Sequence, residues 1–178
     1  MYEEIIIAGS GGQGIMFFGN ILCNAAVLQD KYTTFFPSYG AEIRGGTANC
    51  SVIISDDEIG SPVISNPSIL IIMNEPSYRK FEPSVKKNGL VFVNSSLMKS
   101  IPSPSMSGRI CVPATELALQ IGDVRTANMV MLGKFIVETT TKKIFSADTI
   151  TDSIKNVLKN KKKLLDINLT ALKRGMKL

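Results

Sequence analysis

The sequence predicts an α/β domain of three layers, Rossmann-like in type, in which helices cover both faces of a mostly parallel β-sheet. Short apolar segments with strand character, at residues 5–8, 69–73 and 90–94, alternate with stretches whose apolar residues recur every three or four positions. Such alternation is typical of a sheet whose strands are joined by helices. A glycine-rich turn also follows the first strand and opens a helical pattern. The pattern ends in helices, which predicts a helical C-terminus.

The chain of 178 residues is expected to form a single domain over residues 1–178. At this length a domain buries about two thirds of the surface that its unfolded chain exposes. Hydrophobic residues make up 44% and charged residues 20%, a composition typical of folded rather than disordered chains. No leader pattern opens the chain, and no apolar run approaches the about twenty residues that a membrane span needs. We therefore expect a cytoplasmic protein without a membrane partner.

The glycine turn at residues 9–14 is the most informative motif. Gly9, Gly11 and Gly14 fit the spacing G-x-G-x-x-G between a strand and a helix. Glycine lets the backbone approach a ligand closely, and the start of the helix offers unpaired N–H groups and a partial positive charge. Together with Gly12 and Gln13, these residues predict a cradle for an anionic group.

The second expected strand limits which anion this cradle binds. A dinucleotide site needs an acid at the end of that strand to hold a ribose hydroxyl. Residues 32–36 end without one, and the nearest acids are Asp30 before them and Glu42 after them. This argues against an NAD site. The missing Gly-Lys-Ser/Thr sequence argues more strongly against a P-loop.

A second glycine-rich segment at residues 37–46 is too irregular for a helix or a strand and predicts a loop. A right-handed crossover makes the first two strands parallel, which places this loop beside the first glycine turn on one rim. In the functional interpretation Arg44 binds an anion, Glu42 orients it and Tyr39 offers a stacking face. Gly45 and Gly46 complete the rim. Alternatively, a Glu42–Arg44 ion pair merely braces the loop; the neighbouring cradle leads us to favour function.

The remaining pattern predicts the other elements. Residues 47–55 form a strand that turns at Asp56-Asp57 and returns over residues 58–62 as an inserted antiparallel hairpin. Residues 69–73 form a central strand buried on both faces. Gly133 and Asn128 interrupt the apolar pattern of one helix and indicate close packing there. Further strands are expected at residues 90–94 and 109–112, a surface loop at 95–108, and helices at 15–28, 74–88, 115–121, 126–139, 146–160 and 164–174.

The residue types that are absent exclude several kinds of chemistry. The chain has no histidine, which removes the usual general base and the commonest metal ligand. Cys23, Cys50 and Cys111 lie far apart without a C-x-x-C pair, so we expect buried thiols in a reducing compartment rather than a metal centre. We therefore predict no catalytic residue and no metal ligand in this chain.

The net charge of +5 comes largely from basic residues late in the chain. Such residues serve nucleic-acid binding in some proteins. No aromatic residues are interleaved with them for base stacking, so we interpret them as a solvated helix face and expect no nucleic-acid partner. The residues are Lys155, Lys159, Lys161, Lys162, Lys163, Lys173, Arg174 and Lys177.

Two segments together resemble a known family. Residues 7–14, IAGSGGQG, and residues 37–50, PSYGAEIRGGTANC, strongly resemble the gamma subunit of 2-oxoacid:ferredoxin oxidoreductases. Residues 52–62 and 128–133 look similar to the same family. The resemblance covers most of the chain, and the pair of glycine motifs is far more specific than either motif alone.

The resemblance implies an α/β subunit of a larger enzyme that oxidatively decarboxylates a 2-oxoacid to its acyl-coenzyme A and passes electrons to ferredoxin. Thiamine diphosphate, magnesium and iron–sulfur clusters are then expected on the alpha, beta and delta partners, and this chain alone is expected to be inactive. The glycine motifs are expected to help position coenzyme A or to dock a thiamine-bearing subunit. Among substrates, 2-oxoglutarate and branched-chain 2-oxoacids are favoured over pyruvate and indolepyruvate.

Two other functions stay open on the sequence. A free-standing nucleotide-binding module would bind NAD or FAD as an isolated chain. A purely structural interaction subunit would use the same turns to pack against a partner, because glycine permits close approach of protein and of phosphate alike.

Overall fold

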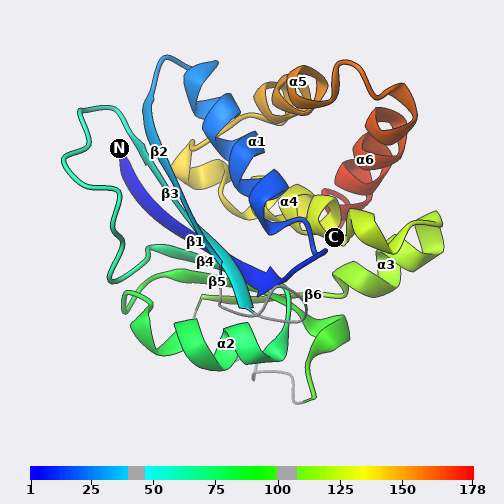
Figure 1. Ribbon diagram of the computed structural model, residues 1–178, viewed down its shortest axis with the longest axis horizontal. Coiled ribbons are helices and arrows are strands. Elements are labelled where there is room, and N and C mark those ends of the chain that lie inside the picture. Colours follow the sequence, from blue (N-terminus) through cyan, green and yellow to red (C-terminus); the bar gives the residue numbers. More distant parts are fainter. Residues whose placement is uncertain (40–46, 100–107) are drawn as a thin grey trace.

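The computed structural model describes residues 1–39, 47–99 and 108–178 (Figure 1). These residues form one six-stranded sheet with helices on both faces, so the expected α/β class, the three layers and the helical C-terminus are confirmed. The strands are β1 (Tyr2–Ser10), β2 (Tyr32–Tyr39), β3 (Thr47–Ser55), β4 (Ile69–Ile72), β5 (Leu90–Asn94) and β6 (Arg109–Val112). The α-helices are α1 (Ile15–Val27), α2 (Glu75–Phe81), α3 (Ala114–Ile121), α4 (Ala127–Glu138), α5 (Ala147–Leu158) and α6 (Lys162–Gly175). Short 3-10 turns are η1 (Glu82–Ser84), η2 (Ser95–Leu97), η3 (Val124–Thr126) and η4 (Thr140–Lys142).

The strand order is β2-β3-β1-β4-β5-β6. Strands β1, β4, β5 and β6 pair in parallel, whereas β3 pairs antiparallel with both β1 and β2. The mostly parallel sheet with an antiparallel part is therefore as predicted. Strand β4 lies between β1 and β5 and is buried along its whole length, which confirms the expected central strand.

The predicted hairpin of residues 47–55 with residues 58–62 is wrong, because β3 pairs with a different strand. Residues 58–62 do not form a strand, and β3 instead forms its hairpin with β2, which precedes it. The physical reason is that β3 already has β1 on one side and β2 on the other. No free edge of β3 remains for a returning strand. The hairpin is joined by residues 40–46, which lie outside the described residues.

Strand β2 also differs from its expected place. It runs in the same direction as β1, since each is antiparallel to β3, but β3 separates the two strands. It continues beyond the expected end at Phe36, through Pro37, to Tyr39. Proline is tolerated because β2 is an edge strand that leaves one side of its backbone unpaired.

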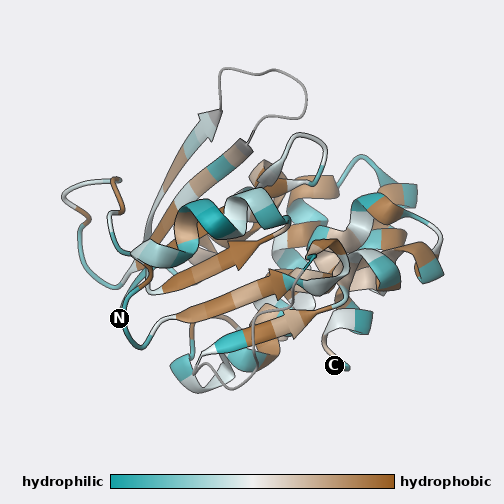
Figure 2. Cartoon of the chain, turned by 90° about the horizontal axis from the view of Figure 1, so that it is seen from below, coloured by the Kyte–Doolittle hydropathy of each residue, from teal (hydrophilic) through white to brown (hydrophobic). Residues whose placement is uncertain are grey.

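The two faces of β1 contribute to two separate apolar clusters. Ile5 and Ile7 pack in the larger cluster with α1 and α4, and Ile6 and Ala8 pack in a smaller one beneath α2. This alternation is what the two-residue period of a strand requires. Figure 2 shows the brown, apolar strands passing behind α2, whose outward face is largely teal. In the described part of the chain, no helix is both long enough and apolar enough to cross a membrane.

Helix α2 is shorter than predicted. Asn74 caps its start by accepting a hydrogen bond from the Ser77 amide at 3.0 Å. The helix ends at Phe81, well before residue 88, because Pro83 lacks the N–H that the next turn needs. A single 3-10 turn, η1, follows instead.

Helices α4 and α6 approach each other at two glycines. A Cβ at Gly133 would overlap the carbonyl oxygen of Leu172, and a Cβ at Gly175 would overlap that of Val130. Backbone on both sides makes this contact rigid. The close packing that Gly133 predicted within an apolar helix is therefore confirmed.

We predict that Gly133→Ala destabilises the protein by about 1–3 kcal/mol or more, because two backbones have to separate to accept the methyl group. Gly60→Ala is the matched control, since no atom of the residues that the structure describes lies within 4 Å of its added Cβ, and it should change stability by less than about 0.5 kcal/mol. Urea unfolding followed by circular dichroism measures both. Equal stability of the two variants would contradict the packing described for α4 and α6.

Candidate functional site

The glycine turn lies at the carboxyl end of β1, where the chain enters α1. This is the edge of an open α/β sheet at which ligands collect. Gly12 has a φ of 90° and Gly14 a φ of 71°, both in the left-handed region that favours glycine. Gly14 is also the N-cap of α1. The turn therefore needs glycine at these two positions for its backbone path.

The side chain of Gln13 braces the turn from inside. Its Oε1 accepts a hydrogen bond from the Ser10 amide at 2.7 Å, and its Nε2 donates to the Met73 carbonyl at 3.1 Å. Asn74 adds a bond from its Nδ2 to the Ser10 hydroxyl at 2.6 Å. These contacts join the end of β1 to the end of β4. In this structure the Gln13 carboxamide is thus occupied in holding the turn.

Two of the predicted glycines are fixed by close packing. A Cβ at Gly9 would lie 2.6 Å from Gln13 Oε1 and 2.9 Å from Met73 Cβ. A Cβ at Gly14 would overlap the side-chain amide of Asn128, which donates to the Gly14 carbonyl at 3.2 Å. The polar Asn128 within apolar helix α4 is therefore explained by its contact with the glycine turn.

Gly11 and Gly12 are the exposed part of the turn. No atom of residues 1–39, 47–99 or 108–178 lies within 4 Å of a Cβ built at either residue. Helix α1 behind them has no side-chain cap and no acidic residue in its first turn. Its first N–H groups have no carbonyl partners within the helix, and they carry the positive end of the helix dipole. This donor set suits an anion that approaches from solvent.

The second predicted segment leaves and re-enters the sheet at the same edge as this turn. Thr47, the first residue of β3, stands opposite Ser10, the last residue of β1. Tyr39, the last residue of β2, stands opposite Ala48. The end of the intervening segment at Thr47 thus lies beside the carboxyl end of β1, and the end at Tyr39 lies one strand further away, on β2. Glu42, Arg44, Gly45 and Gly46 lie outside the described residues.

A polar cluster missed by the sequence reasoning continues along the same edge. Asn94, at the end of β5, is fully buried; its Nδ2 donates to Thr115 Oγ1 at 2.8 Å, and its Oδ1 accepts from the Thr115 amide at 3.3 Å. Asn74 occupies a similar position two residues after β4. A polar residue at or just after the end of each buried strand was the signal for this cluster.

The thiols are structural in character. Burial raises the pKa of the Cys50 thiol to about 12. Its Sγ lies 3.6 Å from the Ile15 carbonyl. Burial also raises the pKa of Cys23 and of Cys111. Among residues 1–39, 47–99 and 108–178, no cluster of three or more histidine, cysteine or acidic side chains is placed to hold a metal.

The two types of glycine in the turn should respond differently to substitution. Gly14→Ala should destabilise the protein by about 1–3 kcal/mol, because the methyl group meets Asn128 and the backbone has a positive φ. Gly11→Ala should change stability by less than about 0.5 kcal/mol. Denaturant unfolding measures both. The double variant Gly14→Ala/Asn128→Ala should regain part of the loss; a double variant that merely sums the single losses would contradict the contact.

Comparison with known proteins finds relatives that are all subunits of enzymes acting on 2-oxoacids. The family model described as pyruvate ferredoxin/flavodoxin oxidoreductase matches residues 4–178. The ketoisovalerate oxidoreductase subunit VorA of Methanothermobacter thermautotrophicus is 36% identical over 176 residues, covering 97% of this chain and 35% of VorA. The 2-oxoglutarate synthase subunit KorC of Methanocaldococcus jannaschii is 38% identical over 136 residues, covering 75% of this chain and 73% of KorC. This chain therefore spans about a third of the length of VorA and most of the length of KorC.

Solved structures show the same fold. The gamma subunit of a keto/oxoacid ferredoxin oxidoreductase from Geobacter sulfurreducens superposes with a TM-score of 0.80 at 26% identity, covering 98% of this chain and 96% of that one. A 2-oxoglutarate:ferredoxin oxidoreductase from Magnetococcus marinus gives a TM-score of 0.87 at 22% identity, covering 99% of this chain and 30% of the other. The chain belongs to the pyruvate ferredoxin/flavodoxin oxidoreductase family, as one of its gamma-type subunits.

Proposed function

We propose that this chain is the gamma component of an assembly that oxidatively decarboxylates a 2-oxoacid to its acyl-coenzyme A and passes electrons to ferredoxin. Alpha, beta and delta partners carry thiamine diphosphate with magnesium and the iron–sulfur clusters. The gamma chain contributes a rim that combines the glycine turns with three side chains. The turns are Gly9, Gly11, Gly12, Gln13 and Gly14 with Gly45 and Gly46, and the side chains are those of Tyr39, Glu42 and Arg44. This rim positions coenzyme A against the catalytic partners.

The observation that carries the proposal is the open backbone at Gly11 and Gly12 in front of the uncapped helix α1. A pyrophosphate group accepts hydrogen bonds from several N–H groups at once, and a helix N-terminus supplies them together with a favourable dipole. The second strand has no acid at its end to bind a ribose hydroxyl. This favours coenzyme A over NAD, because binding of the coenzyme A pyrophosphate does not require such an acid.

The residues of this chain do not suit the other cofactors of such an assembly. An iron–sulfur cluster is held by several thiolates. The cysteines here are separate free thiols with raised pKa values, and the chain has no histidine. The electron-transfer and carbanion chemistry is therefore assigned to the partners.

We further propose 2-oxoglutarate or a branched-chain 2-oxoacid as the substrate. The names of the relatives support these two: VorA is a ketoisovalerate oxidoreductase subunit and KorC a 2-oxoglutarate synthase subunit. A gamma subunit of Thermococcus litoralis, 30% identical over 152 residues and matched over 82% of its length, is named as common to pyruvate and ketoisovalerate oxidoreductases. A pocket built by other subunits explains how one gamma type accompanies different acids.

A second candidate function is that of a subunit that binds only its protein partners. The engaged carboxamide of Gln13 and the tight surroundings of Gly9 favour it, because both residues serve the internal structure of the turn. The two functions differ in what meets Gly11 and Gly12. Coenzyme A meets them in the first, and a partner loop meets them in the second.

Gly11→Val separates these functions in the reconstituted complex. A Cβ added at Gly11 meets no atom of the described residues within 4 Å, so folding should be unchanged, but the valine side chain stands where the anion approaches. We predict an increase in the coenzyme A KM of about tenfold or more. Gly60→Val, which is equally open, is the control.

Arg44→Ala tests the charged part of the rim. Loss of a hydrogen-bonded guanidinium should raise the coenzyme A KM by about ten- to a hundredfold. Normal assembly with an unchanged KM in both Gly11→Val and Arg44→Ala would rule out the coenzyme role. Loss of assembly would instead identify the rim as a subunit interface.

The partners are tested by affinity purification of the chain from its native cells. We expect a thiamine-binding chain and a cluster-bearing chain to purify with it, and the complex to reduce ferredoxin with one 2-oxoacid in preference to the others. A chain that purifies alone and binds NAD or FAD would favour the free-standing nucleotide-binding module.

A further inference from the structure

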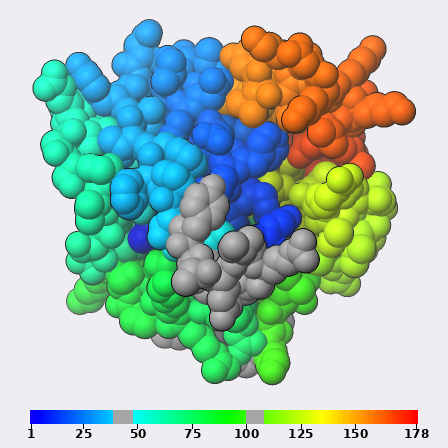
Figure 3. Space-filling view, in the orientation of Figure 1, coloured from blue at the N-terminus to red at the C-terminus, as the bar shows by residue number. Residues whose placement is uncertain are grey.

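The net positive charge of the chain is concentrated near its C-terminal end. Residues 147–178 carry eight basic and three acidic side chains, so they account for the whole net charge of +5. Five of the basic residues fall within nine positions where α5 gives way to α6, and all five are exposed. Figure 3 shows this orange part of the chain projecting from the body of the molecule. We call these residues the lysine corner: Lys155, Lys159, Lys161, Lys162 and Lys163.

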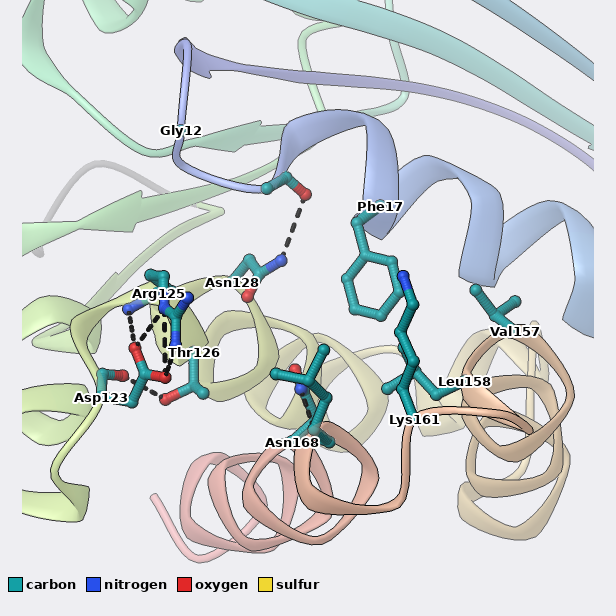
Figure 4. Close-up of a pocket in the computed structure, with 12 residues that line it drawn as sticks. Gly12, Phe17, Asp123, Arg125, Thr126, Asn128, Val157, Leu158, Lys161 and Asn168 are labelled. Atoms are coloured by element: carbon teal, nitrogen blue, oxygen red, sulfur yellow. Dashed lines mark hydrogen bonds and ion pairs between the residues drawn. The ribbon is translucent and has the colours of Figure 1, made fainter.

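The backbone beneath the lysine corner is held in place. The Lys161 amide donates to the Leu158 carbonyl at 2.7 Å, and the Lys161 carbonyl accepts from the Leu165 amide at 2.9 Å. Leu158 is 6% exposed and Asn168 is 8% exposed. Both line the pocket drawn in Figure 4, on the side of the corner that faces α1 and α4. The exposed lysines therefore project from a well-packed corner between two helices.

Most of this charge has no partner within the protein. Lys155 pairs with Asp152 at 2.9 Å, one turn earlier on α5. The other four lysines make no ion pair with any residue that the structure describes. Asp166 is the one acid in the sequence of α6, and it is exposed. A field of unpaired positive charge therefore extends into solvent at low salt.

Three of the lysines stand where they oppose the stability of α6. Lys161 is the N-cap of this helix, Lys162 and Lys163 open its first turn, and that turn contains no acidic residue. A helix N-terminus carries a partial positive charge, so acids stabilise this position and lysines destabilise it. The Lys161 side chain also gives the helix no capping hydrogen bond. A surface that keeps such charges at a cost in stability is a candidate for binding.

The composition of the lysine corner favours a protein over other anionic partners. Residues 155–178 contain no aromatic side chain on which a nucleic-acid base could stack. The apolar side chains Ile150 and Ile154 of α5 are buried in the core, so they are not available to enter a membrane surface. Val157, 39% exposed, and Leu164, 37% exposed, lie among the lysines. Two partly exposed aliphatic side chains flanked by lysines suit the carboxylate-bearing face of another protein.

The same composition favours a contact that forms and breaks. Interfaces between permanent subunits are large and apolar, and lysine is depleted in them. Long, exposed lysines instead attract an acidic partner over a distance and make an interface that depends on salt. In the proposed assembly, the protein that has to bind and leave during turnover is the electron acceptor.

We propose that the lysine corner is a docking surface for the acceptor protein, ferredoxin, and that it recognises an acidic face of that protein. The inference rests on the proposed function, because such an acceptor is needed only in an assembly that passes electrons to one. It gives this chain a role in electron transfer although the chain carries no cluster: the corner attracts and orients the acceptor, and a partner subunit reduces it.

The test uses the assembled complex with two acceptors, ferredoxin from the same cells and methyl viologen, a small dye that needs no docking surface. Lys162→Glu/Lys163→Glu should raise the ferredoxin KM by about tenfold at low salt, because attraction becomes repulsion. The rate with the dye and the KM values of the 2-oxoacid and coenzyme A should stay unchanged. At about 0.5 M salt the ferredoxin KM values of the variant and the unmodified complex should converge, because screening removes the attraction.

Lys173→Glu/Lys177→Glu is the matched control. It makes the same change in charge at two exposed lysines near the opposite end of α6, about 15 Å along the helix axis. Screening should limit its effect on the ferredoxin KM to less than about twofold. An equal increase in both double variants would show that only the total charge matters, and it would overturn the docking surface.

Urea unfolding of the full chain separates docking from folding. Lys162→Glu/Lys163→Glu replaces two charges that oppose the α6 dipole with two that favour it, so the urea midpoint should rise or stay equal. A raised ferredoxin KM in this variant then reflects lost docking. A lower midpoint would show that the two lysines serve the fold, which would overturn the proposal.

The kinetic results also distinguish this inference from the proposed function. A complex that oxidises no 2-oxoacid with either acceptor refutes the proposed function, and the docking surface with it. Normal oxidation with the dye and an unchanged ferredoxin KM in Lys162→Glu/Lys163→Glu refutes the docking surface alone. Loss of a partner subunit from this variant during purification would identify the corner as a permanent interface, which also overturns the proposal.

Discussion

The candidate site depends on how the chain leaves the buried strand β1 and enters α1. Gly12 and Gly14 supply the left-handed backbone of the turn, and Gln13 ties it to Ser10 and to the carbonyl of Met73. The side chains of the turn are therefore either absent or directed into the protein. What faces solvent is main chain, at the uncapped and positive end of a helix. The proposed recognition at this edge therefore relies on backbone amides, which favour an anionic group over a particular side-chain pairing.

Periodicity and spacing predicted the local features. The apolar run at residues 69–73 gave a fully buried central strand, and Gly133 within an apolar helix indicated the contact that it makes with α6. Periodicity and spacing did not predict the order of the strands in the sheet, because that order depends on residues far apart in the sequence. Strand β3 inserts between β1 and β2, and this choice of partners follows from the whole sheet rather than from residues 47–62. The return strand was predicted from a local turn signal that the sheet does not use.

The sequence predicted the backbone path of the glycine turn, but it did not predict which distant residues contact the turn. The glycine spacing identified the turn, because the strand, the turn and the helix are adjacent in sequence. The Asn128 contact joins residues 114 positions apart, one on α4 and the other at the start of α1. Nothing in a local pattern specifies such a meeting. The polar Asn128 was nevertheless visible as an exception within an apolar helix, and its position explains that exception.

The proposed division of labour agrees with the physical character of the chain. A subunit without histidine, whose three thiols are buried or half-buried with raised pKa values, has few groups for acid–base or redox chemistry near neutral pH. A braced glycine turn on a well-packed sheet is suited instead to the proposed role of holding a substrate while other subunits react with it. Figure 3 shows that the helices α1, α5 and α6, in blue, orange and red, form one continuous face beside this edge.

The most direct test of this account is amide hydrogen exchange of the assembled complex, measured with and without saturating coenzyme A. Slower exchange at the backbone amides of residues 11–17 on coenzyme binding is the predicted result, because hydrogen-bonded amides exchange more slowly. Unchanged exchange at those amides, in a complex that turns over coenzyme A normally, would contradict the claim that the glycine turn binds it.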